Sequence, residues 1–176
     1  MSRKYRIYDQ ADLQFMTYAT VDWVDALSRP AYKDIIVESF RFCQEQKGLQ
    51  LYAWCIMSNH VHLIAKADPG PKLEDIMRDH KKHTSKALMK AIAENGKESR
   101  REWMLKHFRK SGGSSQFWQH DLHPIWIRTP EVVERYLNYL HRNPVAAGLV
   151  KEPEHYVYSS AGSYLGLPSM LDVILI

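Results

Sequence analysis

Two stretches rich in strand-forming residues, 49–57 and 60–67, meet at the short link Met57-Ser58-Asn59. A link of this length leaves room for little more than a turn, so we expect the two stretches to pair as an antiparallel hairpin. The second stretch carries His60 and His62. Residues two apart in a strand project from the same face, so both imidazoles are placed to reach one metal ion.

The flanking sequence alternates between strand and helix patterns. Residues 13–21 alternate and are rich in β-formers, which predicts a strand. A helical pattern begins at Pro30 and is closed by Gly48. Residues 72–93 have the pattern of a second, longer helix. Its expected inner stripe consists of Leu73, Ile76, Met77, His80, Thr84, Leu88 and Ile92.

The second half of the chain is less regular. Residues 94–115 are polar and end in a Gly- and Ser-rich stretch, so we expect a mobile loop there. Residues 116–127 are expected to form a strand. Thr129 and Pro130 are typical of an N-cap and a first helical residue. Asn143-Pro144 predicts the end of this last helix, because a residue before proline resists helical geometry.

The last helix has two distinct faces. Its expected buried stripe consists of Val133, Leu137 and Leu140. Tyr136, Tyr139 and Asn143 lie three and four residues apart, so they stand one above another on a neighbouring face. A face that holds phenols and an amide beside the core is suited to the edge of a site.

The order of these elements is β-α-β-β-α-β followed by a helix. It predicts an α+β fold, in which an antiparallel sheet has helices packed on one face. With 176 residues the chain is expected to form a single domain, 1–176, with a core at about 13–150 and a C-terminal extension at 151–176.

Composition bounds the class of protein. The two cysteines do not have a metal-type spacing, which favours reduced, buried thiols in a cytosolic protein. The sequence shows no signal peptide and no apolar run long enough for a membrane helix. We therefore expect a cytoplasmic protein without a membrane partner.

Positive charge is concentrated in one segment. Residues 78–110 carry eleven Lys or Arg but only four Asp or Glu. Such asymmetry is expected of a surface that faces nucleic acid, and it is equally compatible with a solvated helix face and a basic loop.

Two motifs together resemble the single-tyrosine HUH transposases, the insertion-sequence type that includes the REP-associated tyrosine transposases. The first is His60-Val61-His62, within Met57-Ser58-Asn59-His60-Val61-His62-Leu63. The second runs from Tyr139 to Val150 and includes Asn143-Pro144-Val145. Phe117-Trp118-Gln119 is a weaker third match. Serine replaces the proline that is frequent in the family at position 58.

The resemblance implies a ferredoxin-like or RRM-like HUH fold with a C-terminal tyrosine-bearing helix. By the match, Tyr139 is the attacking nucleophile and Asn143 is the third metal ligand beside His60 and His62. The implied activity is cleavage and rejoining of single-stranded DNA by transesterification, through a 5′-phosphotyrosine intermediate. The implied partner is single-stranded DNA next to a hairpin. A homodimer is a further option, in which Tyr139 acts on its own or its partner's metal site.

The ligand types bear on the metal. Two imidazoles and an amide oxygen leave positions open for phosphate and water, and such an oxygen-rich completion suits Mg²⁺ or Mn²⁺. Basic side chains are expected to grip the DNA phosphates. The candidates are Lys82, Lys86, Lys90, Arg100, Arg101, Arg109 and Lys110. Trp103, Trp118 and Trp126 are candidates for base stacking or for the core.

Several alternatives stay open at this stage. Tyr136 is the rival nucleophile, because it shares the face of Tyr139. The chain could instead be a non-catalytic nucleic-acid-binding module on the same fold. It could also be a metal-dependent hydrolase that uses His60, His62 and His123.

Overall fold

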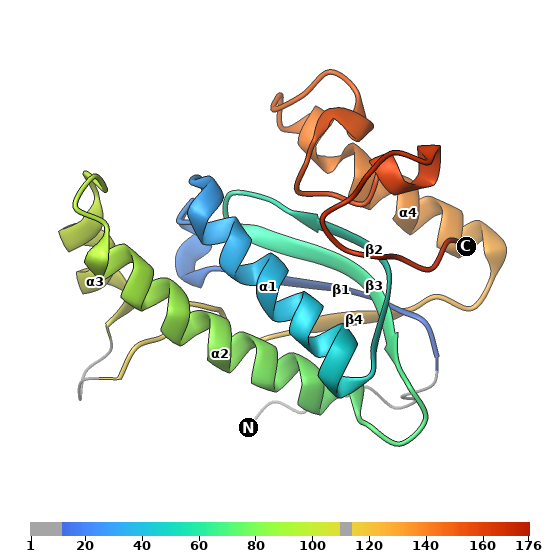
Figure 1. The fold of residues 1–176 in the computed structure, drawn as a ribbon, viewed down its shortest axis with the longest axis horizontal. Helices are drawn as coiled ribbons and strands as arrows, with labels where there is room; N and C mark the ends of the chain where they lie inside the picture. Colours follow the sequence, from blue (N-terminus) through green and yellow to red (C-terminus); the bar gives the residue numbers. More distant parts are fainter. Residues whose placement is uncertain (1–11, 110–113) are drawn as a thin grey trace.

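A four-stranded antiparallel sheet forms the centre of the molecule (Figure 1). The computed structural model describes residues 12–109 and 114–176. The strand order is β2-β3-β1-β4 and every neighbouring pair is antiparallel. The strands are β1 (Gln14–Ala19), β2 (Leu49–Ile56), β3 (His60–Ala67) and β4 (His123–Trp126). The predicted hairpin of β2 and β3 is confirmed.

Two long helices cover one face of this sheet. They are α1 (Pro30–Lys47) and α2 (Leu73–Glu94), which pack against each other. The backbone of α1 ends at Gly48, whose φ of +71° is one that L side chains rarely adopt. Every residue of the predicted inner stripe of α2 is buried, because its three- and four-residue spacing keeps it on one side of the helix.

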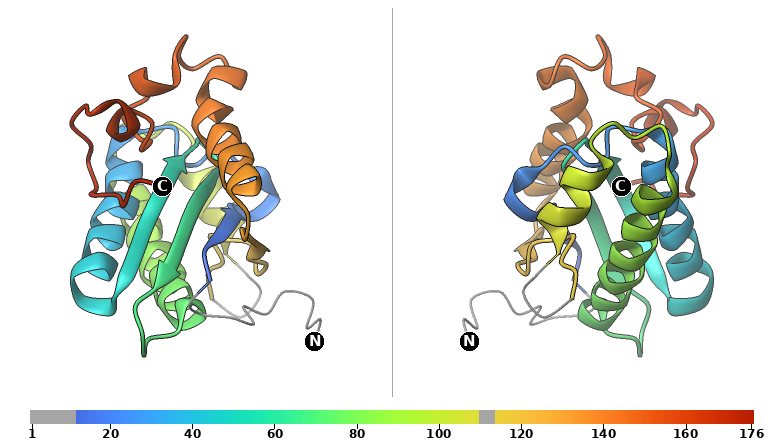
Figure 2. Two further views of the ribbon diagram at one scale, coloured as in Figure 1. Left: turned by 90° about the vertical axis from the view of Figure 1, so that its right-hand side faces the viewer. Right: turned by 90° about the vertical axis from the view of Figure 1, so that its left-hand side faces the viewer.

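The last helix, α4 (Pro130–Ala146), contacts β2 and β3 from the opposite face of the sheet. In β1, Tyr18 points to α2, where it is hydrogen-bonded to His80, whereas Phe15 points to α4 and stacks on Tyr136. Odd and even positions of a strand face opposite ways, so the sheet separates the two helical layers. The left view of Figure 2 shows the sheet between α1 and α4. The predicted α+β fold is confirmed, with α4 added on the second face.

The helix α4 confirms one predicted boundary and corrects the other. The Thr129 side chain caps the first turn by accepting a hydrogen bond from the backbone N–H of Val132. The helix does not end at Asn143, as predicted, but continues through Pro144 to Ala146. The last turn is still closed by a hydrogen bond from the backbone N–H of Ala147 to the carbonyl of Asn143, so the helix passes the proline before it ends.

Two other predictions in the middle of the chain are wrong. The expected loop over 94–115 contains a helix, α3 (Arg101–Phe108), whose Met104 and Phe108 are buried. The strand expected over 116–127 is only the four residues of β4. Earlier in that stretch only an isolated bridge joins Trp118 to Thr20, so pairing with the first strand is interrupted before β4 begins.

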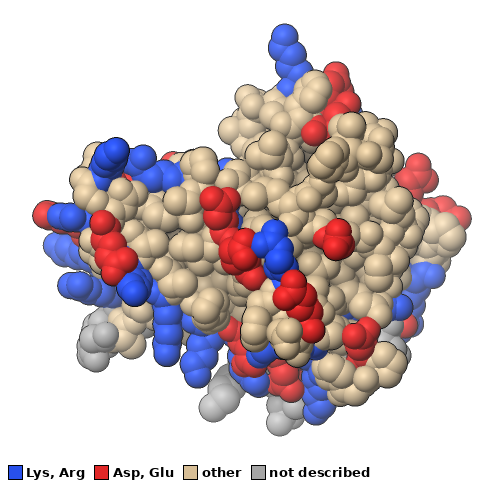
Figure 3. All heavy atoms as spheres, in the orientation of Figure 1, with Lys and Arg blue, Asp and Glu red and all other residues tan. Residues whose placement is uncertain are grey.

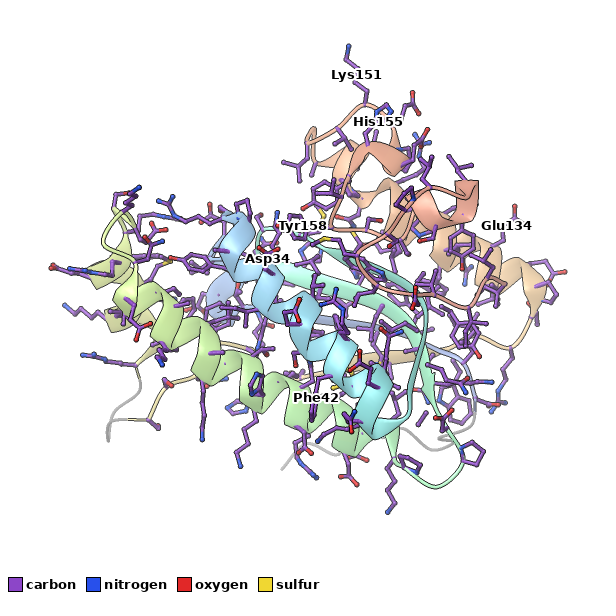
Figure 4. All side chains as sticks on the ribbon, viewed as in Figure 1. Asp34, Phe42, Glu134, Lys151, His155 and Tyr158 are labelled. Atoms are coloured by element: carbon purple, nitrogen blue, oxygen red, sulfur yellow. The ribbon has the colours of Figure 1, made fainter. Side chains whose placement is uncertain are left out.

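The C-terminal segment packs along the outer edge of β2. Backbone hydrogen bonds join Tyr158 and Ser160 to Ile56 and Trp54 of that strand. The Tyr158 hydroxyl also donates to Asp34 of α1 at 2.8 Å, and Figure 4 shows these two side chains approaching each other. Residues 151–176 therefore pack on the sheet and on α1. In the described part of the chain, no helix is both long and apolar enough to span a bilayer.

Candidate active site

The two histidines of the HUH motif lie side by side on the face of β3 that is turned to α4. In the register of β1 and β3, His60 pairs with Ala19 and His62 with Thr17. The ring centroids of His60 and His62 are 4.6 Å apart. The prediction that strand spacing places both imidazoles on one face is confirmed.

Each imidazole is held through its Nδ1 atom. His60 Nδ1 lies 2.6 Å from Oδ1 of Asn59, and His62 Nδ1 lies 2.7 Å from Oγ1 of Thr17. An amide oxygen can only accept, so His60 carries its proton on Nδ1 and keeps the lone pair on Nε2. A second hydrogen bond of this kind is the usual way in which a protein orients a histidine that binds a metal.

Burial keeps both rings uncharged. It lowers the pKa of His60 to about 4, against a smaller opposing effect of a hydrogen bond with Asn143. Burial, with a smaller contribution from the neighbouring His60, lowers the pKa of His62 to about 3. Both histidines are therefore neutral at pH 7, which is the form that binds a metal ion.

Asn143 of α4 reaches the same place from the other side. Its Nδ2 lies 3.2 Å from Nε2 of His62, although the two residues are 81 positions apart in the sequence. The oxygen and nitrogen of an amide exchange places when the side chain turns over, so Oδ1 can take this position toward a cation. In the described residues, no group of three His, Cys, Asp or Glu could hold a metal. The polar groups that meet at this point are two imidazoles and one side-chain amide.

Tyr139 and Tyr136 have different environments on α4. The Tyr139 ring is 52% exposed, and its centroid lies 5.3 Å from that of His62. Its hydroxyl makes no hydrogen bond to the described part of the protein. The Tyr136 ring is partly buried and stacks on Phe15, with centroids 4.6 Å apart. Tyr139 has the accessible phenol, and Tyr136 is a packing residue.

The predicted DNA-contacting residues lie away from this centre, around α2 and α3. Figure 3 shows Lys and Arg side chains gathered over these two helices. Lys82 and Lys86 are exposed at the rim of a cavity of about 780 Å³ between α2 and residues 114–122. This cavity lies on the α2 side of the sheet, whereas the histidines face α4.

The other basic candidates have varied environments. Arg100 is paired with Asp25, and Lys90 lies 3.9 Å from Glu94. Arg101 is partly buried, whereas Arg109 is exposed at the end of α3. Lys110 lies outside the described residues.

Sequence reasoning missed the residues that support the site. Thr17 and Asn59 hold the two imidazoles, and Trp23 places its ring edge-on to His60 with centroids 5.5 Å apart. The sequence offers some indication of Asn59, because it is the last residue of the hairpin link and directly precedes His60. It offers none of Thr17, since only the strand register brings that residue opposite His62.

Comparisons with known proteins identify the family of the chain. The model of the IS200-like transposase family matches residues 25–126, more than half of the chain. The chain belongs to the IS200-like transposases. The matched segment of this IS200-like transposase includes both histidines of the HUH motif and ends before α4.

One solved structure shows the same fold, and a second is a weaker match. A REP-associated tyrosine transposase bound to a REP hairpin is 18% identical in sequence, with a TM-score of 0.66. The match covers 100% of this IS200-like transposase and 95% of that chain. A protein from Deinococcus radiodurans assigned as a transposase is 19% identical, with a TM-score of 0.48 over 80% of this chain and 97% of its own. Among curated proteins there is no match.

Proposed function

We propose that this protein cleaves and rejoins single-stranded DNA by metal-assisted transesterification, with Tyr139 as the nucleophile. The observation that carries the proposal is the meeting of two distant motifs. Nε2 of His62 in β3 lies 3.2 Å from Nδ2 of Asn143. The ring centroids of His62 and Tyr139 are 5.3 Å apart. Nothing in the packing of α4 requires an exposed phenol at this point.

The residues divide the chemistry between them. In cleavage, the Tyr139 oxygen forms a bond to phosphorus and the bond from phosphorus to the 3′-oxygen breaks. The phenol proton leaves to solvent, because the ring is half exposed. The products are a 5′-phosphotyrosine and a free 3′-hydroxyl, and attack by that hydroxyl reverses the reaction.

His60, His62 and Asn143 are proposed to hold a divalent cation, Mg²⁺ or Mn²⁺. When bound, such an ion polarises a phosphoryl oxygen and stabilises the charge on the leaving oxygen. The neutral imidazoles and the amide add no negative charge of their own. They therefore leave the cation free to offset the charge of the phosphodiester.

The proposed partner is DNA with a hairpin beside a single-stranded segment. Two features support it: the basic side chains over α2 and α3, and the fold shared with a transposase that was solved on a REP hairpin. Because Tyr139 meets the histidines of its own chain, we propose that one protomer can carry out cleavage. A homodimer stays compatible with this arrangement.

The test is the capture of a covalent protein–DNA adduct. The probe is a pool of 3′-labelled oligonucleotides, each with a hairpin and randomised single-stranded flanks, incubated with Mg²⁺ or Mn²⁺. We expect a labelled adduct that survives denaturing electrophoresis, because the 3′ fragment stays on the tyrosine. Chelation of the metal abolishes it. Tyr139→Phe abolishes it and Tyr136→Phe, the matched control, retains it.

Other outcomes would overturn the proposal in distinct ways. An adduct that persists in Tyr139→Phe and disappears in Tyr136→Phe would assign the chemistry to the other phenol. Nicking without an adduct would indicate a hydrolase that activates water. Binding without any cleavage would indicate a DNA-binding module on the transposase fold.

A further inference from the structure

The turn after β1 holds an exposed tryptophan in an unfavourable backbone conformation. Asp22 and Trp23 have φ values of +54° and +56°, and no other non-glycine residue in the described ranges has a positive φ. This left-handed conformation is costly for a bulky side chain. Proteins keep such residues where surrounding contacts fix them, and they are concentrated at functional sites.

The contacts that fix Trp23 also fix a candidate metal ligand. The backbone N–H of Trp23 bonds to the carbonyl of Thr20, and its own carbonyl accepts from Nδ2 of Asn59 at 3.1 Å. The same Asn59 side chain accepts from Nδ1 of His60 through its oxygen. One amide therefore positions both the imidazole of His60 and the turn that carries Trp23.

This arrangement leaves the indole half in solvent beside the site. The Trp23 side chain is 52% exposed, although burial of an indole would stabilise the fold. Its ring meets that of His60 at an angle of 61°. Packing of the core does not account for a large apolar ring in this position.

A histidine that stacks on a second exposed tryptophan lies close to the same turn. Oδ2 of Asp22 lies 3.1 Å from Nε2 of His107 in α3. The His107 ring stacks on Trp103, with centroids 5.1 Å apart and an angle of 19°, and Trp103 is 51% exposed. The ion pairs of Arg29 with Glu98 and of Arg100 with Asp25 hold this part of the chain against residues 98–107.

The charge around α3 indicates what the two rings contact. Its cationic neighbours are Arg100, Arg101, Lys106 and Arg109, of which Lys106 and Arg109 are exposed. Flat aromatic faces among cations are typical of surfaces that bind single-stranded nucleic acid, where bases stack and phosphates pair with Lys or Arg. A protein partner would be expected to cover a larger and less charged apolar patch.

We propose that Trp23 and Trp103 form a stacking track for the bases of single-stranded DNA that leads into the active site. Trp23 takes the base next to the phosphodiester held at His60, and Trp103 takes a base further along the strand. The position of Trp23 relative to the cleaved bond rests on the proposed function. The stacking itself does not.

The test compares two probes with the same phosphates, oligo(dT) of about 12 nucleotides and an abasic strand of equal length. Affinities are measured by fluorescence anisotropy with a chelator present, so that no cleavage intervenes. Trp23→Gly removes the indole and suits the positive φ. We expect it to weaken binding of oligo(dT) about 10-fold to 100-fold and to leave binding of the abasic strand unchanged.

Phe42→Ala is the matched control, because Phe42 is a similarly exposed aromatic residue on α1 (Figure 4). It is expected to leave both affinities unchanged, and Trp23→Phe is expected to retain most of the preference for bases. Urea unfolding checks that each variant is folded. Equal affinities of Trp23→Gly and Phe42→Ala for oligo(dT) would overturn the track.

The two proposals fail separately. If Tyr139 forms adducts while Trp23→Gly binds oligo(dT) normally, the track is wrong and the transesterase stands. If Trp23→Gly loses the preference for bases and no adduct ever forms, the track stands on a protein that only binds DNA.

Discussion

Thr17 is the residue on which the orientation of His62 depends. The Thr17 hydroxyl in β1 lies 2.7 Å from Nδ1 of His62 in the adjacent strand β3. This contact leaves Nε2 as the ring nitrogen that faces Asn143. Loss of such a supporting hydrogen bond typically weakens metal binding about 10-fold to 100-fold.

We therefore expect Thr17→Val, which keeps the shape of the side chain, to weaken Mn²⁺ binding about 10-fold to 100-fold. The measurement is isothermal titration calorimetry with Mn²⁺ in the absence of DNA. Thr17→Ser keeps the hydroxyl and is expected to bind nearly as the native protein does. Equal affinities of the two variants would show that the hydroxyl does not orient the ring.

At the scale of elements, the position of α4 decides where Tyr139 stands. His141 of α4 is buried, and its Nε2 lies 2.8 Å from the hydroxyl of Ser160. The Ser160 hydroxyl also accepts from the backbone N–H of Trp54 in β2. One serine therefore links the tyrosine helix to the sheet that carries the histidines.

Ser160→Ala is expected to destabilise the fold by about 1–3 kcal/mol, because it leaves buried polar groups of His141 and Trp54 without a partner. It should also slow adduct formation more than it weakens DNA binding, because α4 loses the hydrogen bond from His141 that helps to hold Tyr139 in position. Urea unfolding and adduct yield with time measure the two effects. Ser163→Ala is the control, because the buried Ser163 hydroxyl has no hydrogen-bond partner among the described residues.

Local patterns predicted the elements whose side chains alternate or recur regularly. The β2–β3 hairpin, the buried stripe of α2 and the cap at Thr129 were accessible in this way, because each depends on residues close in sequence. The helix α3 had a similar signal in Met104 and Phe108, four residues apart, but the charged residues around them obscured it. The strand over 116–127 was overestimated because Phe117 and Trp118 are strand-forming residue types, although only an isolated bridge joins Trp118 to Thr20 before β4 begins.

The site itself was less accessible from spacing alone. The pair His60 and His62 follows from strand geometry, but only the resemblance to a family placed Tyr139 and Asn143 beside it. The left-handed turn at Asp22 and Trp23 was not predicted, because a bulky residue such as Trp23 rarely adopts a positive φ, although Asp does so more readily. The turn is explained by the Asn59 side chain, which contacts the carbonyl of Trp23 and the ring of His60. The contact with Trp23 exists only after the sheet has formed.

At the scale of the molecule, buried histidines make stability depend on pH. His80 lies between α2, β1 and α1, with hydrogen bonds to Tyr18 and Ser39. Burial, with smaller contributions from the neighbouring His83 and Lys81, lowers its pKa from 6.5 to about 3. Unfolding therefore takes up a proton below pH 6.5, so this contribution to stability is complete above that pH and is lost as the pH falls toward 3.

Between pH 7 and pH 5 we expect His80 alone to reduce the free energy of unfolding by about 2 kcal/mol. Urea unfolding at the two pH values measures the loss. His80→Gln cannot titrate, so its stability should fall by about 2 kcal/mol less over the same range, whatever its stability at pH 7. An equal loss in both proteins would place the acid sensitivity elsewhere.

The backbone hydrogen bonds between β2 and Tyr158, Ser160 and Ile174 affect how two copies of the protein can associate. An edge strand with free amide and carbonyl groups is a template on which a neighbouring chain can add a strand and start an aggregate. Here the protein's own C-terminal segment already bonds to the edge of β2. Edge-to-edge pairing of two molecules along β2 is therefore blocked where this segment bonds to Leu51, Trp54 and Ile56.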